Sequence, residues 1–245
     1  MAGLRHWNVV LGQFFFRYRN TIFPVIFLLV ALTTKPKVIL NHATLDRILV
    51  IDGAFIALGG ELFRLVTIGY DYIDRGGKDG QAYASRLVQK GMYTHTRNPM
   101  YFGNILIAIG VSMVCGSSLA YLIVIPFFLF VYHAIASSEE AYLQRRFGQE
   151  YDEYCRRVPR FIPSLRGAYQ LFAKTRYNWK RALRQDLSTI VGLLMGLTLI
   201  PLWRAYFLQG FAAAKALVLR TLILSLAVLS FYVLVHSLKK RGRLQ

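Results

Sequence analysis

The sequence predicts an all-α integral membrane protein with about six transmembrane helices. Of its 245 residues, 55% are hydrophobic, whereas roughly 45–50% is usual in soluble domains. The hydrophobic residues gather in blocks, and several blocks approach the roughly 20 residues that a helix needs to cross a hydrocarbon core. Basic residues mostly flank these blocks. Together, the three observations favour a bundle of membrane helices over a soluble domain.

The predicted membrane helices occupy six segments: 21–34, 46–70, 101–115, 119–137, 187–207 and 216–236. The first comes after an entry segment rich in arginine and phenylalanine. No A-x-A-like cleavage site follows it, so we expect a retained helix instead of a signal peptide. We divide the chain into an entry segment with the first helix (1–45), a membrane core with cytoplasmic loops (46–185), and a terminal helix pair with a basic tail (186–245).

Two opposite charges lie inside the second predicted helix. Glu61 and Arg64 are three residues apart, so they share a helix face and can neutralise each other. A charged residue within a membrane helix is a functional candidate by default. The alternative is an ion pair near the helix end, with Arg64 reaching the interface on its long apolar stem. The sequence leaves both interpretations open.

A very short link joins the third and fourth predicted helices. Three residues, 116–118, connect them, and so short a link forces a tight antiparallel hairpin over about 101–137. The stretch 98–101 before the hairpin and the pair Glu139 and Glu140 after it must therefore lie close together on one side of the membrane. We expect an amphipathic cytoplasmic segment to follow.

The distribution of charge predicts the orientation of the chain. The net charge is +18, and Lys and Arg concentrate at both termini and in the loops 71–100 and 138–185. The positive-inside rule then places these parts in the cytoplasm, N-in and C-in. We expect a protein of the bacterial inner membrane or, in a eukaryote, of the endoplasmic reticulum, in contact with membrane lipids. Nucleic-acid binding is not expected, because the basic residues do not form an aromatic-interleaved soluble face.

The two cysteines of the chain indicate neither a disulfide nor a metal site. Cys115 and Cys155 fall on opposite sides of the membrane in this topology. No spacing typical of metal ligands occurs. Neither a disulfide nor a metal site is predicted.

The segment 87–103, LVQKGMYTHTRNPMYFG, leads directly into the third helix. Pro99 suits the first helical turn because it has no N–H to satisfy there. Thr96 or Asn98 can cap the helix with a side-chain oxygen. The free N–H groups of such a helix start can receive a carboxylate or a phosphate.

The acidic pair Glu139-Glu140 comes just after the fourth predicted helix. Neighbouring residues point about 100° apart on a helix, so both carboxylates cannot face one ligand equally. One can bind a cationic or hydroxyl-bearing ligand while the other is solvated. Alternatively, the pair marks the start of another helix, where the helix dipole favours acids.

Two stretches taken together resemble a known superfamily. Residues 87–104 follow G-x-Y-x-x-x-R-[HN]-P-x-Y-x-G, and residues 139–163 give the Glu pair followed by F-G-x-x-Y-x-x-Y-x-x-x-V-P. With the hairpin between them, they look like the isoprenylcysteine carboxyl methyltransferases and phospholipid methyltransferases of membranes. The resemblance covers about 55–165.

The resemblance implies S-adenosylmethionine as methyl donor, held at the cytoplasmic membrane edge, and a lipidic or prenylated substrate whose acceptor is a carboxylate, an amine or a hydroxyl. A carboxylate acceptor needs no base, whereas an amine must lose a proton. The oligomeric state stays open. By motif position, the candidate catalytic residues are Arg97, Glu139 and Glu140. The candidate cofactor contacts are Leu87, Val88, Tyr93, His95, Asn98, Pro99, Met100, Tyr101, Gly103 and Glu139.

The chain departs from the family pattern in three places. Asn98 replaces the usual His of the R-H-P core. His133 and the residues after it stand where the isoprenylcysteine enzymes carry an Arg, one turn before the Glu pair. Two predicted helices extend beyond the usual end of the family. Two alternatives therefore remain: an NADPH-dependent sterol-type membrane reductase, whose family ends in a similar Y-C-x-x-V-P stretch, and a non-catalytic membrane scaffold of the same fold.

Overall fold

The computed structural model describes residues 2–70, 86–164, 166–167, 169 and 176–243. Within these ranges the chain is helical and contains no strand, which confirms the predicted all-α class. The seven described α-helices are α1 (Ala2–Thr33), α2 (Ala43–Tyr70), α3 (Pro99–Cys115), α4 (Ile125–Phe147), α5 (Gln149–Arg157), α7 (Trp179–Gln209) and α8 (Phe211–Lys240). Residues 71–85 of the predicted loop 71–100 lie outside the described residues.

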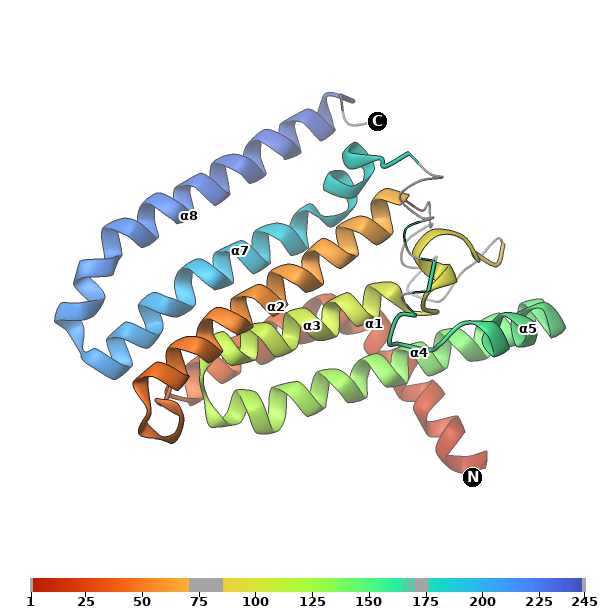
Figure 1. Cartoon of the computed structure of the whole chain (residues 1–245), viewed down its shortest axis with the longest axis horizontal. Helices are drawn as coiled ribbons and strands as arrows, with labels where there is room; N and C mark the ends of the chain where they lie inside the picture. Colours follow the sequence, from red (N-terminus) through yellow and green to blue (C-terminus); the bar gives the residue numbers. More distant parts are fainter. Residues whose placement is uncertain (1, 71–85, 165, 168, 170–175, 244–245) are drawn as a thin grey trace.

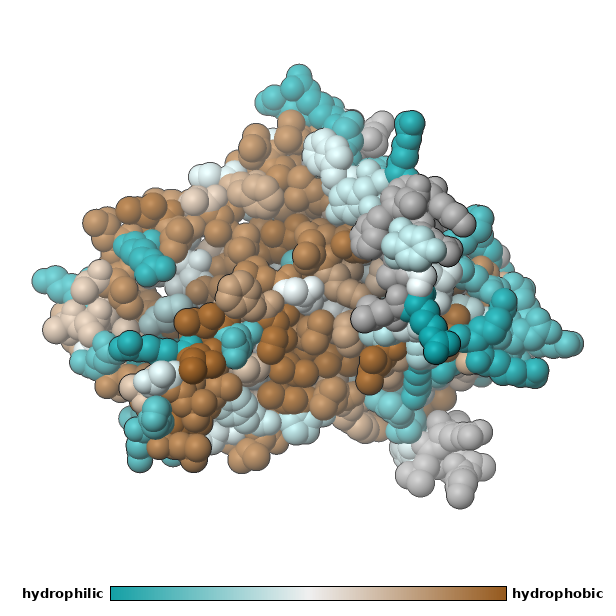
Figure 2. All heavy atoms as spheres, in the orientation of Figure 1, coloured by the Kyte–Doolittle hydropathy of each residue, from teal (hydrophilic) through white to brown (hydrophobic). Residues whose placement is uncertain are grey.

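The long helices lie side by side in an elongated bundle (Figure 1). Both chain termini, the loop before α3 and the helix α5 gather at one end, whereas the turns from α3 to α4 and from α7 to α8 lie at the other. Hydrophobic residues cover the middle of the visible face, and hydrophilic residues concentrate towards the ends (Figure 2). This distribution is typical of a bundle that spans a hydrocarbon layer.

Four of the described helices are long and apolar enough to cross a membrane: Trp7–Thr33, Ala120–Phe147, Trp179–Gln209 and Phe211–Lys240. They correspond to four of the six predicted spans. The other two predicted spans are the helices α2 and α3, which fall outside this set. α3 is a shorter apolar helix, and α2 carries Glu61 and Arg64 in its interior.

Helix boundaries differ most from the predicted ones at the start of α1 and at the end of α4. α1 begins at Ala2, well before residue 21, because the aromatic entry segment is itself helical and packs on α4. α4 continues to Phe147 instead of ending near 137. The residues after 137 are strong helix formers without Gly or Pro until Gly148, whose φ of 51° ends the helix. The interpretation of the Glu pair as a helix start is therefore wrong: both residues lie inside α4.

The predicted hairpin is present, but the predicted side-chain cap of α3 is wrong: Asn98 is the N-cap residue and makes no capping hydrogen bond with its side chain. A short turn at Gly116, with φ 62°, ends α3 and leads through a π-helical turn, Ala120–Val124, into α4. Pro99 is the first residue of α3. The helix α5 is amphipathic: its residues Tyr151 and Tyr154 are buried and form a small apolar cluster, while its charged residues face outward.

Paired glycines bring α2 and α3 into close contact. Gly60 faces Gly103, and Gly53 faces Gly110. A Cβ added to Gly60 would lie 2.6 Å from the carbonyl oxygen of Gly103, which is closer than real Cβ atoms approach backbone. Small residues at such positions let membrane helices pack backbone to backbone. The spacing between α2 and α3 is therefore fixed by residues without side chains.

Two buried ion pairs fasten α7 to α2. Arg64 of α2 binds Asp186 of α7 through two hydrogen bonds, one of them 3.1 Å long from Nε to Oδ2. Arg204 of α7 binds Asp46 of α2 at 2.5 Å and donates to the carbonyl oxygen of Cys115 at 2.9 Å. These pairs lie towards the two ends of α7. They make the C-terminal helices an integral part of the bundle.

Arg64 also forms the predicted pair with Glu61, at 3.4 Å. Its side chain is only 5% exposed. The interpretation that Arg64 reaches the interface is therefore wrong, because two carboxylates hold the guanidinium inside the bundle instead.

Replacing Gly60 by Ala tests the α2–α3 contact. The new methyl group meets the backbone of α3, so we expect a loss of about 1–3 kcal/mol of stability, seen as a lower thermal unfolding midpoint in detergent. Gly59→Ala is the matched control, because no atom lies within 4 Å of its added Cβ. This variant should be neutral or slightly stabilised, since Ala favours a helix over Gly. Equal midpoints for the two variants would contradict the close packing.

Asp186→Asn tests the fastening of α7. It removes one partner of a buried ion pair, a change that typically costs about 3–5 kcal/mol. We expect a large drop in the denaturant or thermal midpoint of the full chain in detergent. The control is Asp52→Asn, an exposed aspartate on α2. If both variants unfold at the same point, the Arg64–Asp186 pair does not hold α7 in place.

Candidate functional site

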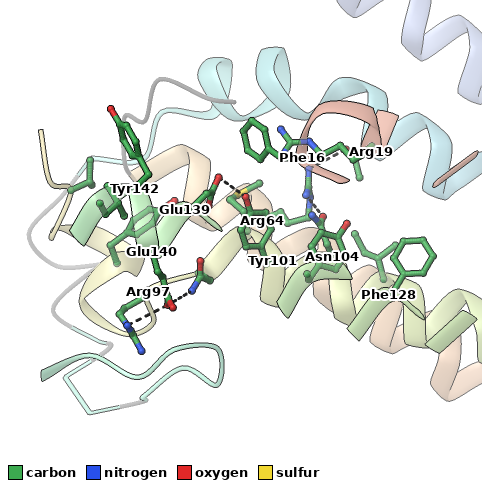
Figure 3. Close-up of a pocket in the computed structure, with 18 of the residues that line it drawn as sticks. Phe16, Arg19, Arg64, Arg97, Tyr101, Asn104, Phe128, Glu139, Glu140 and Tyr142 are labelled. Carbon is green, nitrogen blue, oxygen red and sulfur yellow. Dashed lines mark hydrogen bonds and ion pairs between the residues drawn. The ribbon is translucent and has the colours of Figure 1, made fainter. Parts of the chain in front are cut away.

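A cavity of about 730 Å³ opens at the end of the bundle that carries both termini. It lies between α1, α3 and α4, with further lining residues from α2, α5, α7 and the loop before α3 (Figure 3). Its size is within the range of pockets that hold small molecules and cofactors. We call the part lined by residues 86–101 with Glu139 and Glu140 the mouth, and the part lined by apolar residues of α1, α3 and α4 the interior.

Most of the residues that the sequence singled out line the mouth of this cavity. They are Leu87, Val88, Tyr93, Arg97, Asn98, Met100, Tyr101, Glu139 and Glu140. Residues before α3 and residues late in α4 meet here because the hairpin returns the chain to the same end of the bundle. The spatial meeting of the two motif stretches, which the short link predicts, is confirmed by a 2.7 Å hydrogen bond from Tyr101 to Glu139.

Three of the singled-out residues do not line the cavity. His95 is buried, and its Nδ1 lies 2.7 Å from the carbonyl oxygen of Ser164. Pro99 is buried in the first turn of α3. Gly103 lies against α2, where an added Cβ would be 2.6 Å from Cγ of Arg64. Their contacts hold the loop and the helices in position.

Glu140 is the centre of a cluster of cations. Its carboxylate lies 3.2 Å from Nη1 of Arg97 and 3.0 Å from Nη2 of Arg160. Burial lowers the pKa of the Arg97 guanidinium, but its interactions with Glu140 and with the neighbouring Cys155 and Tyr151 outweigh this effect and raise the pKa above its ordinary value. Arg97 therefore stays protonated.

Sequence reasoning did not identify Arg160, which joins the segment after α5 to α4. Its guanidinium contacts Nε2 of His133 and Oγ of Ser137, each at 2.7 Å. It thus brings a cation next to His133, the position at which the family resemblance leads one to expect an arginine. The sequence signal is weak, because Arg160 is one of several arginines in a basic segment and lies 27 residues from His133.

Glu139 has surroundings that differ from those of Glu140. The hydroxyl of Tyr101 donates to its Oε1 at 2.7 Å, and among the described residues this is its one hydrogen-bond partner. The ring of Tyr101 stacks on that of Tyr132, with 5.4 Å between centroids. Glu139 therefore presents a carboxylate to the cavity, whereas Glu140 is taken up by arginines (Figure 3).

The interior of the cavity is mainly apolar and aromatic. Its apolar lining residues are Phe16, Phe23, Phe27, Ile107, Ala108 and Phe128. A polar group borders this region, where Arg64 donates to Asn104 and Asn104 interacts with the hydroxyl of Tyr132. Ser188 and Thr189 of α7 also line the cavity, and Thr189 accepts a 3.0 Å hydrogen bond from Arg64. The sequence did not indicate these contributions from α1 and α7, because both helices lie far from the motif stretches along the chain.

Comparison with known proteins identifies the segment that builds most of this site. The family model described as phospholipid methyltransferase matches residues 54–150. The Delta(14)-sterol reductase TM7SF2 of Mus musculus is 36% identical over 85 residues, which are 34% of this chain and 20% of the reductase. The protein-S-isoprenylcysteine O-methyltransferase of Schizosaccharomyces pombe is 34% identical over 77 residues, which are 31% of this chain and 33% of that protein.

A third similar protein is the nickel-cobalt-cadmium resistance protein NccN of Alcaligenes xylosoxydans xylosoxydans, 36% identical over 83 residues, 34% of this chain and 38% of that protein. The chain thus spans a fifth to two fifths of the length of these curated relatives. No solved structure matches the chain significantly. Residues 54–150, less than half of the chain, are thus similar to the phospholipid methyltransferase family, and the chain is distantly similar to isoprenylcysteine O-methyltransferase and sterol reductase.

Proposed function

We propose that the chain is an S-adenosylmethionine-dependent methyltransferase that acts on a lipidic or lipid-anchored acceptor. The observation that carries the proposal is the continuity of the cavity, whose polar mouth opens into an aromatic interior. A soluble, charged cofactor fits the mouth, and the apolar part of a lipid fits the interior. The match of residues 54–150 to the phospholipid methyltransferase family model supports the same reaction class.

The groups at the mouth suit the parts of S-adenosylmethionine. Met100 and Tyr101 lie in the first turn of α3 and line the cavity, and first-turn N–H groups lack partners within the helix. They would receive the carboxylate of the methionyl part. Glu139 would take its ammonium group or the ribose hydroxyls. Leu87 and Tyr93 offer apolar and aromatic surface to the adenine.

S-adenosylmethionine supplies a methyl group on a sulfonium, which an acceptor oxygen or nitrogen displaces in line. The task of the protein is to align the two molecules and to exclude water. We assign the contact with the cofactor to Glu139, because Tyr101 fixes its carboxylate while leaving acceptor capacity towards the cavity. We assign a positioning role to Arg97 and Glu140, whose ion pair ties the loop before α3 to α4.

The proposed topology has six spans, with α2 and α3 crossing inside the group of four apolar helices. Both termini and the mouth lie at the same end of the bundle (Figure 1). Because the basic loops and the basic tail gather at this end, the positive-inside rule favours a cytoplasmic location for it. The host membrane would be the bacterial inner membrane or the endoplasmic reticulum.

The similarity to a sterol reductase supports a second candidate, an NADPH-dependent membrane reductase. NADPH carries a 2′-phosphate that needs cations, and Arg97 at the mouth is already paired with Glu140, although Arg19 and Arg86 also line the cavity. The carboxylate of Glu139, which suits the ammonium group of S-adenosylmethionine, favours the first candidate. A non-catalytic scaffold of the same fold would bind neither cofactor.

Calorimetry on the purified full chain in detergent distinguishes these candidates. We expect S-adenosylmethionine to bind and NADPH not to bind. Binding of NADPH alone would overturn the methyltransferase proposal in favour of a reductase. Absence of heat with both cofactors would favour the scaffold.

Glu139→Gln tests the proposed cofactor contact. The substitution keeps the shape but removes the charge that pairs with an ammonium group, and we expect affinity for S-adenosylmethionine to fall about tenfold or more. Glu153→Gln is the matched control, because Glu153 is exposed on α5 and does not line the cavity. Titration calorimetry measures both. An unchanged affinity in Glu139→Gln would remove this residue from the cofactor site.

A further inference from the structure

One wall of the cavity comes from outside the segment that matches the methyltransferase family. α1 precedes residues 54–150, yet it contributes five lining residues: Phe16, Arg19, Asn20, Phe23 and Phe27. The positions follow the i, i+3, i+4, i+7 pattern that places residues on one face of a helix. This face packs against α4, where Phe23 lies 4.7 Å from Phe128 between ring centroids. This wall is therefore built by α1, outside the segment that matches the family model.

Arg19 is the one cation in this wall. Its side chain is half-buried, and its guanidinium lies over the ring of Phe16, 4.3 Å from the centroid. Among the described residues, no carboxylate forms an ion pair with it. By contrast, Arg64 across the cavity is balanced by Glu61 and Asp186. Arg64 is thus neutralised within the bundle, whereas the charge of Arg19 acts on the cavity itself.

The charge of Arg19 acts on residues at the boundary between the mouth and the interior. It interacts electrostatically with Glu139 and Tyr101 on the mouth side and with Tyr132 towards the interior. Figure 3 shows Arg19 beside Phe16, on the side of the cavity opposite Arg97. A cation in mainly apolar surroundings is costly unless an anion accompanies it. Glu139 acts on Arg19 without forming an ion pair with it, so an acidic group on a ligand would be the direct anionic partner of the guanidinium.

We propose that Arg19 is an anion-binding residue that makes the cavity selective for acidic amphiphiles. The acid group, a carboxylate or a phosphate, pairs with the guanidinium, and the hydrocarbon part lies along Phe23, Phe27 and Phe128. That this amphiphile is the methyl acceptor rests on the proposed function. The selectivity for an acidic amphiphile does not, because it follows from the charge and the apolar lining alone.

The test measures binding to the purified full chain in an uncharged detergent, without S-adenosylmethionine. Radiolabelled oleate is the probe, detected by scintillation proximity on immobilised protein. Unlabelled 1-oleoylglycerol 3-phosphate and oleyl alcohol compete as phosphate-bearing and uncharged relatives. We expect oleate to bind and oleyl alcohol to compete weakly. Competition by the phosphate compound shows that any acid group suffices, and its absence shows that the carboxylate is the group recognised.

Three variants assign the effect to Arg19. Arg19→Gln should weaken oleate binding about tenfold, as expected for the loss of a charge-assisted hydrogen bond, and should leave competition by oleyl alcohol unchanged. Arg19→Lys should restore part of the affinity because it keeps the charge. Arg17→Gln is the matched control: it removes the same charge two residues away, from an exposed position outside the cavity.

Two results would overturn the proposal. One is an equal loss of oleate and oleyl alcohol binding in Arg19→Gln, which would mean that Arg19 only supports the packing of α1. The other is an equal affinity for oleate in Arg19→Gln and Arg17→Gln. The separate titration with S-adenosylmethionine distinguishes a failure of the methyltransferase proposal from a failure of this one. If oleate binding depends on Arg19 but the chain does not bind S-adenosylmethionine, the methyltransferase proposal is wrong and the proposal for Arg19 is supported.

Discussion

The buried guanidinium of Arg64 is the interaction on which the arrangement of the bundle depends. It joins α2 to α7 through Asp186, to α3 through Asn104, and to its own helix through Glu61. Away from water, a guanidinium needs partners for all its donors, so the three helices cannot slide or rotate independently. Gly103 of α3 packs against the aliphatic stem of Arg64. Arg64 therefore also fixes the close approach of α3 to α2. The cavity borders this junction, and its shape follows from it.

Patterns that are local in the sequence predicted the fold and much of the site. Hydrophobic blocks indicated the membrane helices, and the short link at 116–118 brought Tyr101 next to Glu139. Boundaries were less predictable: the helicity of the entry segment and the extension of α4 to Phe147 depend on packing and on the absence of breakers, not on hydropathy. The role of the Glu pair changed accordingly, from a possible helix start to a position inside α4.

Contacts between distant segments could not be predicted from the sequence. Arg160 reaches His133 and Glu140 only because the chain folds back after α5. Likewise, Arg64 finds Asp186 at a separation of 122 residues, and nothing in the pattern of either helix indicates its partner. Motif positions therefore identified the mouth of the cavity, whereas its interior could be identified only from the three-dimensional arrangement.

The continuous helix α4 fixes the distance between the mouth and the interior of the cavity. Glu139 and Phe128 belong to one helix, and 11 residues at about 1.5 Å each separate them by roughly 17 Å along its axis. A rigid helix keeps this separation constant, so the depth of the cavity below Glu139 does not adjust to a ligand. For the acidic amphiphile proposed above, chain length would add a criterion to head-group chemistry: a short tail would leave the space beside Phe128 unfilled, and a longer one would have to bend or emerge between helices into the bilayer.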